Sequence, residues 1–141
     1  MTFAWQGFLR VAQALVDDLD NEVREAKCRT ASGRAYHAAF CTARDHVRHD
    51  LGDRNVPKRG AHQYVRDNIV RHRRTSVHYR TVAVALRRLH TDRLKADYEE
   101  EWLDQDLGEV ARKAVASAKR ALDHLAALRR GVNGTSPASR P

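Results

Sequence analysis

Apolar positions recur at helical spacing along most of this chain, and no run of residues alternates with the period of a β-strand. The pattern predicts five helices, over residues 2–19, 22–51, 61–72, 77–100 and, from 104 or 107, to 130. The connections between them are short, which favours neighbouring helices that run antiparallel. The predicted fold is therefore all-α, an antiparallel up-and-down bundle of four or five helices.

Each of these helices except the second has one apolar face that is expected to point inward. The inner positions are Phe8, Val11, Ala12, Leu15 and Leu19 in the first; Tyr64, Val65, Ile69 and Val70 in the third; Val82, Ala85, Leu86, Leu89, Leu94 and Tyr98 in the fourth; and Val110, Ala114, Ala118, Ala121, Leu125 and Leu128 in the fifth.

The second predicted helix carries two such stripes. One consists of large and small apolar residues, Tyr36, Phe40, Ala43, Val47 and Leu51, and the other of small residues, Ala31, Ala35, Ala38 and Thr42. A helix with two inward faces has neighbours on both sides, so this helix is expected at the centre of the bundle. Arg29, Arg34 and His37 interrupt the stripes, and they are the first candidates for a functional site.

The length of 141 residues and the 42% hydrophobic content fit one folded domain. We expect this domain to span residues 1–130. Residues 131–141 are rich in Gly, Ser, Thr and Pro, a composition typical of a disordered tail.

Positive charge is concentrated in the middle of the chain. The net charge is +8, and residues 53–95 hold 12 Lys and Arg residues against 3 Asp and Glu residues. One interpretation is a solvated basic helix face. The other is a surface that contacts nucleic-acid phosphates, and it makes RNA the expected partner.

The two cysteines, Cys28 and Cys41, lack the spacing of a C-x-x-C motif. They are expected to be buried, reduced thiols, which suits a cytoplasmic protein. The chain has no basic, apolar leader at its N-terminus and no apolar run of about 18 residues, so secretion and membrane spanning are not expected.

Four stretches resemble one known family in the right order. Residues 34–40, Arg-Ala-Tyr-His-Ala-Ala-Phe, resemble the S-R-x-Y-Y-A-x-F signature of YAAF-type HEPN domains, with Gly33 at the Ser position and His37 at the second Tyr. Residues 61–65 are similar to the family's H-x-x-V segment, and residues 89–98 to its L-x-x-x-R-x-x-A-D-Y segment. Residues 109–118 fall where the family has an Ala-rich last helix. The resemblance covers roughly residues 5–130.

The resemblance implies an antiparallel helical bundle that is usually dimeric and belongs to a bacterial toxin–antitoxin or anti-phage defence system, often beside a small nucleotidyltransferase. Many HEPN proteins are metal-independent ribonucleases that use an R-x4–6-H motif. The Arg can hold the scissile phosphate, and the His can move a proton. At the corresponding place in this chain Arg93 is followed by Tyr98 and not by His. Tyr is a poor general base near neutral pH.

Arg73 and His78 form another R-x4–H pair, at the start of the fourth predicted helix. They are the candidate catalytic residues of an endoribonuclease. Four windows of this type occur in the chain, whereas composition alone is expected to give roughly 3.6. The motif therefore adds little weight to the enzyme hypothesis.

Two sets of residues are candidates for binding a nucleotide or RNA phosphate. The first is a polar patch made of Arg34, His37, Arg93, Asp97 and Tyr98, and the second is a basic helix face with Arg74, Arg80, Arg87 and Arg88. The alternative for the first set is structural: a buried Arg93–Asp97 pair that fixes helix register, with Tyr36 packed on Tyr98.

His46 and His49 lie next to Asp45 and Asp50, but no third ligand has suitable spacing. We expect no metal and no cofactor. Three hypotheses remain from the sequence. The protein binds RNA or a nucleotide-bearing partner as a homodimer, or it is an active endoribonuclease, or it is a non-catalytic scaffold that contacts other proteins through its Ala-rich surfaces.

Overall fold

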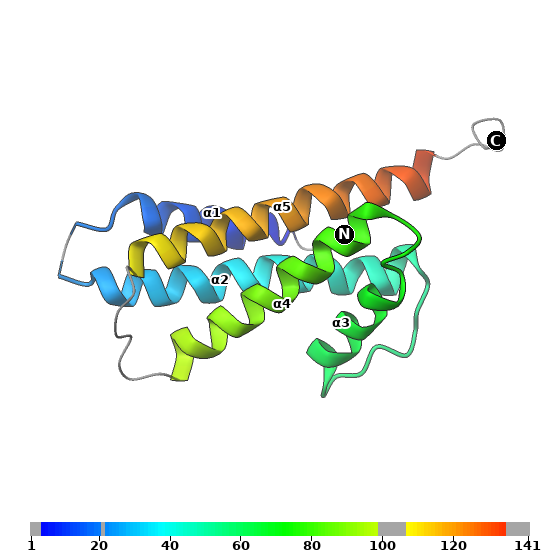
Figure 1. The fold of residues 1–141 in the computed structure, drawn as a ribbon, viewed down its shortest axis with the longest axis horizontal. Helices are drawn as coiled ribbons and strands as arrows, with labels where there is room; N and C mark the ends of the chain where they lie inside the picture. The colour runs from blue at the N-terminus through cyan, green and yellow to red at the C-terminus, as the bar shows by residue number, and fades with distance from the viewer. Residues whose placement is uncertain (1–3, 21, 99–106, 135–141) are drawn as a thin grey trace.

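The computed structural model describes residues 4–20, 22–98 and 107–134. These residues form five α-helices and one short π-helix, with no strand among them. The elements are α1 (Gln6–Asp17), α2 (Arg24–Asp45), the π-helix η1 (His46–Asp50), α3 (Ala61–Arg71), α4 (Val77–Tyr98) and α5 (Leu107–Gly134) (Figure 1). The prediction of an all-α helical bundle is confirmed.

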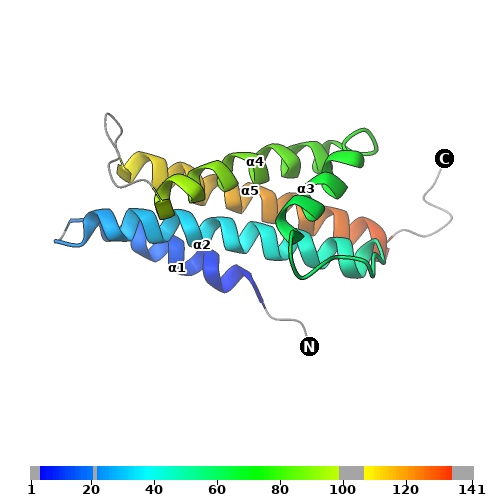
Figure 2. The ribbon, with the colours of Figure 1, turned by 90° about the horizontal axis from the view of Figure 1, so that it is seen from below.

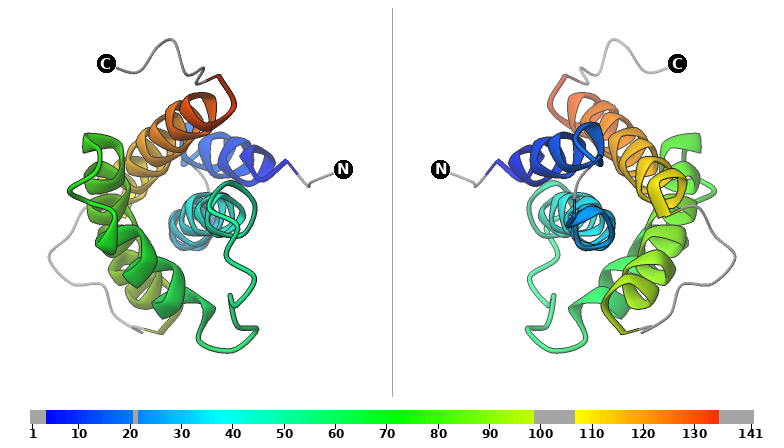
Figure 3. Two further views of the ribbon diagram at one scale, coloured as in Figure 1. Left: turned by 90° about the vertical axis from the view of Figure 1, so that its right-hand side faces the viewer. Right: turned by 90° about the vertical axis from the view of Figure 1, so that its left-hand side faces the viewer.

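The four long helices α1, α2, α4 and α5 lie side by side, and each reverses direction relative to the one before it (Figures 1 and 2). Viewed from the end, they surround a common core, and α3 lies outside this group (Figure 3). Helix α2 contacts α1, α3, α4 and α5. The central position predicted from its two stripes is therefore confirmed.

Both stripes of α2 are buried. Ala31, Ala35 and Ala38 are fully buried, and their small side chains allow the neighbouring helices to come close. Tyr36 is among the largest fully buried side chains of the described residues, and Phe40 is buried beside it. Each aromatic ring contributes roughly 1.5–3 kcal/mol by leaving water, so this part of α2 is a main anchor of the fold.

Four residues predicted to face inward are exposed. Val11 is 47% exposed, Val70 is 38% exposed, Leu94 is 42% exposed and Tyr98 is 75% exposed. In α1 the buried line runs through Ala12 and Val16, which turns Val11 outward. In α4 the buried face continues from Leu89 to Ala96, and Leu94 and Tyr98 lie together, four residues apart, on the outer side.

Two glycines lie at helix boundaries that the sequence predicted, and α5 ends later than predicted. Gly52 (φ +69°) follows η1, and Gly60 (φ +74°) precedes α3, so both glycines adopt the left-handed conformation that the chain reversals require. Helix α5 continues to Gly134, although the sequence predicted its end at residue 130. Glycine weakens a helix without stopping it, and the first proline after this point is Pro137.

Parts of four predictions fall outside the described residues: the start of the first helix at 2–3, the end of the fourth helix at 99–100, the start of the fifth at 104–106, and the tail from 135 onward. None of the helices in the described part of the chain combines the length and the apolar content that a bilayer-spanning segment requires.

Candidate phosphate-binding site

A hollow of about 290 Å³ lies between α2 and the last turns of α4. We call it the arginine hollow; its lining residues are Arg29, Thr30, Gly33, Arg34, His37, Arg93 and Asp97. Four of the five residues of the predicted polar patch are therefore brought together. The fifth, Tyr98, is exposed and is not part of the lining.

Helical geometry explains why these residues meet. Thr30, Gly33, Arg34 and His37 are spaced by three or four residues, so they share one face of α2. Arg93 and Asp97 are likewise one turn apart on α4. The packing of α4 against α2 then places the two faces opposite each other.

Two cations of the hollow rest on aromatic rings. The guanidinium carbon of Arg34 lies 5.2 Å from the ring centre of Phe8, and that of Arg93 lies 5.5 Å from the ring centre of Tyr36. Phe8 also contacts the imidazole of His37 in an edge-on arrangement at 5.9 Å. These contacts restrict the side chains without using their hydrogen-bond donors.

The predicted Arg93–Asp97 pair is present, with 3.2 Å between Nε of Arg93 and Oδ2 of Asp97. Their side chains are 26% and 39% exposed, so the pair is not the buried one that the structural alternative requires. The expected packing of Tyr36 on Tyr98 is wrong. The Tyr36 ring contacts Arg93 and the rings of Phe40, His62 and His90 instead.

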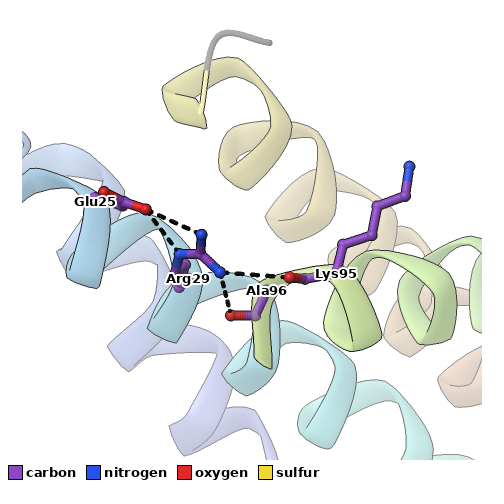
Figure 4. Close-up of polar contacts among 4 residues, drawn as sticks. All are labelled: Glu25, Arg29, Lys95 and Ala96. Atoms are coloured by element: carbon purple, nitrogen blue, oxygen red, sulfur yellow. Dashed lines mark hydrogen bonds and ion pairs between the residues drawn. The ribbon is translucent and has the colours of Figure 1, made fainter. Parts of the chain in front are cut away.

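Arg29 has a different role from the other arginines of the hollow. Its Nη1 atom donates to the carbonyl oxygens of Ala96 at 2.9 Å and Lys95 at 3.4 Å, and its guanidinium also pairs with Glu25 at 3.0 Å (Figure 4). Carbonyls towards the C-terminus of a helix carry partial negative charge, which favours a cation beside them. Arg29 donates to two carbonyls in the last described turn of α4 and so joins this part of α4 to α2.

Three imidazoles from three helices gather next to the hollow, and the sequence did not predict this group. The Tyr36 hydroxyl lies 2.6 Å from Nδ1 of His62, whose ring stacks on Phe40 at 4.0 Å. The rings of His62 and His90 are 6.3 Å apart. Nδ1 of His90 is buried and has no hydrogen-bond partner among the described residues. His37, in the lining of the hollow, is the third imidazole.

Burial and positive neighbours keep these imidazoles neutral. Burial, followed by the charge of Arg93, lowers the pKa of His62 to about 4. Burial and then Arg93, Arg34 and Arg44 lower the pKa of His37, and Asp97 opposes this shift. Burial, Arg66 and Arg93 lower the pKa of His90. The site therefore combines fixed cations with imidazoles whose pKa values burial and these cations hold low.

A second basic surface lies on the other side of α4. A groove of about 290 Å³ between α4 and α5 contains three arginines, Arg80, Arg88 and Arg120, with Thr81 and Ser117 among its other lining residues. We call it the α4–α5 groove. Two of the predicted residues, Arg80 and Arg88, lie in it, whereas Arg74 and Arg87 are exposed outside its lining. Arg120 was not predicted, because nothing in the sequence shows which side of α5 meets α4.

The candidate catalytic pair is not organised as a site in the structure. Arg73 is exposed in the turn before α4, and Nδ1 of His78 lies 2.8 Å from Nδ1 of His124 on α5. In the described part of the chain no hydrogen bond or ion pair joins Arg73 to His78. One nitrogen of His78 is engaged in a contact between helices, and its catalytic role stays a prediction.

The acidic and histidine residues around η1 are used within the fold. Buried His46 bridges Asp50 and the hydroxyl of Tyr79, at 2.8 Å each, and the indole of Trp5 donates to Asp45 at 2.7 Å. Across the described residues, no group of three His, Cys, Asp or Glu side chains is placed to hold a metal ion. Both cysteines are buried, free thiols, as predicted.

Comparison with protein-family models, with curated proteins and with solved structures finds no match to this chain. The functional argument therefore depends on the site and on the resemblance of short motifs.

Proposed function

We propose that this protein binds RNA through the arginine hollow and the α4–α5 groove. The observation that carries the proposal is the convergence of Arg34 and His37 from α2 with Arg93 from α4 on one hollow. Asp97 is the one carboxylate among the described residues that line this hollow, so the charge of this lining suits a phosphate group. Restrained arginines at a concave surface lose little entropy when they bind such a group.

The α4–α5 groove supplies further phosphate contacts. Arg80 and Arg88 lie about two turns apart along α4, and Arg120 lines the same groove from α5. Because both basic surfaces share α4, a single strand can contact this helix on more than one side. Such contacts with the backbone give affinity without sequence readout.

The biological setting is proposed from the motif resemblance. We place the protein in the cytoplasm, as a HEPN-like homodimer of a bacterial toxin–antitoxin or anti-phage defence system, with a nucleotidyltransferase or another defence protein as its partner. The all-α bundle agrees with this assignment and does not distinguish it from other helical families. Co-purification with the product of the neighbouring gene tests the partner.

Salt dependence of RNA binding tests the proposal. Fluorescence anisotropy with a labelled single-stranded RNA is measured for the wild type, for Arg34→Gln with Arg93→Gln, and for Arg80→Gln with Arg88→Gln. Loss of two phosphate contacts should make the slope of log K against log salt concentration shallower by about 1.4 in each double variant.

The matched control is Arg10→Gln with Arg130→Gln, two exposed arginines outside both surfaces that give the same loss of charge. Its slope should stay close to that of the wild type. Equal slopes for all three double variants would show that the two surfaces are not the contact sites, and absence of RNA binding by the wild type would end the proposal.

A further inference from the structure

We infer that the arginine hollow binds a phosphomonoester dianion, and that His37 takes up a proton when this group binds. Such a phosphate stands at the end of an RNA strand or on a free nucleotide. The inference rests on the proposed RNA binding and specifies which phosphate the hollow prefers.

The net positive charge that the hollow offers a ligand is smaller than the number of its arginines suggests. Arg29 is engaged with two carbonyls of α4 and with Glu25, so it does not count toward a ligand. Arg34 and Arg93 remain, and Asp97 offsets one of them. The described residues of the hollow thus present an excess of one positive charge while His37 is neutral.

A phosphodiester and a phosphomonoester differ in how well they neutralise the single excess positive charge of the hollow. A phosphodiester inside a strand carries one negative charge, whereas a monoester carries about −1.5 to −2 near neutral pH. A dianion leaves one negative charge unmatched unless another cation forms. His37 lines the same hollow and can supply that cation by protonation.

The surroundings of His37 favour protonation of its imidazole when a dianion binds. From α1 the Phe8 ring contacts His37. The charged or titratable groups that act on His37 are Arg34 and Arg44 on α2, His62 on α3, and Arg93 and Asp97 on α4. Asp97 is the single carboxylate among these described residues. Arg93, Arg34 and Arg44 lower the pKa of His37 after burial does, and a bound dianion counteracts that repulsion.

The geometry also fits a terminal phosphate. Arg34, His37 and Arg93 are three donors from two helices, and a monoester presents three terminal oxygens where a diester presents two. A hollow of about 290 Å³ is at the small end of ligand sites, large enough for one phosphate and its sugar.

The test compares ligands that differ only in the presence or position of a terminal phosphomonoester. Binding is measured for short single-stranded RNAs of one sequence with a 5′-phosphate, a 3′-phosphate or hydroxyl ends, and for AMP against adenosine. We expect a monoester to bind roughly tenfold more tightly than its hydroxyl counterpart, the effect of one additional charge-assisted hydrogen bond. The arm that shows the preference identifies the source as an RNA end or a nucleotide.

Calorimetry in two buffers of different ionisation enthalpy measures how many protons the complex takes up when the ligand binds. The measurements are made above about pH 7, where a phosphomonoester, with a second pKa near 6, is already a dianion and releases no proton of its own on binding. Under these conditions the wild type should take up a proton when it binds the preferred monoester, and its affinity should fall as the pH rises from about 7 to 8. His37→Gln should abolish both effects, while His49→Gln, a change at an exposed histidine outside the hollow, should abolish neither.

Two results would overturn the inference. Equal affinity for phosphorylated and hydroxyl-ended RNA removes the monoester preference and leaves the proposed RNA binding intact. Proton uptake that persists in His37→Gln removes the role of His37. If no RNA and no nucleotide binds, the proposed function falls together with the inference.

Discussion

The hydroxyl of Tyr36 lies 2.6 Å from Nδ1 of His62 and ties the centre of α2 to the first turn of α3. Burial raises the pKa of Tyr36 to about 12, so the phenol stays protonated and donates a hydrogen bond to the neutral imidazole. Burial and Arg93 lower the pKa of His62 to about 4, which keeps Nδ1 available as an acceptor. Each group is held in the protonation state that the hydrogen bond requires.

The first prediction concerns stability against pH. In the unfolded chain His62 titrates near 6.5, and in the folded protein near 4. Between these values the unfolded chain binds more protons, so the free energy of unfolding falls as the pH is lowered from about 6.5 to 4. Above pH 6.5 this contribution is complete. His37 and His90 shift in the same direction and add to the effect.

Urea unfolding at several pH values between about 6.5 and 4 measures the decrease in the free energy of unfolding. For His62 alone we expect about 1–2 kcal/mol, roughly half of the full linkage value, because the side chain is partly exposed. His62→Gln should flatten the dependence on pH, and His49→Gln should leave it unchanged. Equal pH dependence in the wild type and His62→Gln would contradict the assignment.

The second prediction concerns Arg29 as a cap of α4. Arg29→Gln removes the charge-assisted bonds to the carbonyls of Lys95 and Ala96, and we expect the free energy of unfolding to fall by about 1–2 kcal/mol. Arg112→Gln, at an exposed position on α5, is the control and should change it by less than about 0.5 kcal/mol. If both variants unfold at the same urea concentration, Arg29 does not stabilise the end of α4.

The central helix could be predicted because its signal is local. Tyr36, Phe40, Ala35 and Ala38 repeat at helical spacing, and any helix with two such stripes must be covered on both sides. Within the polar patch, Arg34 and His37 share a helix face by the same local rule, whereas Arg93 and Asp97 were added to them from the motif resemblance. Val11 was assigned wrongly because an apolar residue beside the buried line looks the same in the sequence as one on it.

Other parts of the site depend on contacts between distant segments. The partners of Arg29 lie 66 and 67 residues away, and they are backbone carbonyls whose positions no residue pattern encodes. The gathering of His37, His62 and His90 requires α3 and α4 to meet α2 at one level. The sequence offers three isolated histidines, and only the packing makes them neighbours.

The third prediction uses Gly33, which lines the arginine hollow in the interior of α2. A Cβ atom at this position would meet no atom within 4 Å, and the residue is helical. Gly33→Ala should therefore stabilise the protein by about 0.5–1 kcal/mol and leave RNA binding unchanged. Gly33→Leu should keep the stability and weaken binding, because its side chain fills the hollow. Unchanged affinity in a stable Gly33→Leu protein would locate the RNA elsewhere.

The fourth prediction separates catalysis from structure at His78. The contact between His78 and His124 is lost in either His78→Ala or His124→Ala. We expect the two variants to lose similar stability, about 1 kcal/mol, and to have the same effect as each other on growth of a bacterial host that expresses them. Wild-type toxicity abolished by His78→Ala and by Arg73→Ala, but retained in His124→Ala, would establish the endoribonuclease hypothesis instead.

The fifth prediction is a gain of binding. Asp97 lies 3.2 Å from Nε of Arg93 and is the carboxylate that an incoming phosphate must compete with. Asp97→Asn keeps the size of the side chain and removes that competition, so RNA should bind more tightly, by roughly three- to tenfold. The half-exposed ion pair contributes at most about 1 kcal/mol, so the variant should remain folded.

Anisotropy titrations at one salt concentration measure the change, with Asp123→Asn, at an exposed position on α5, as the control for net charge. A residue that only supports the fold would weaken binding when changed. Tighter binding in Asp97→Asn alone therefore identifies the hollow as the place where the phosphate binds.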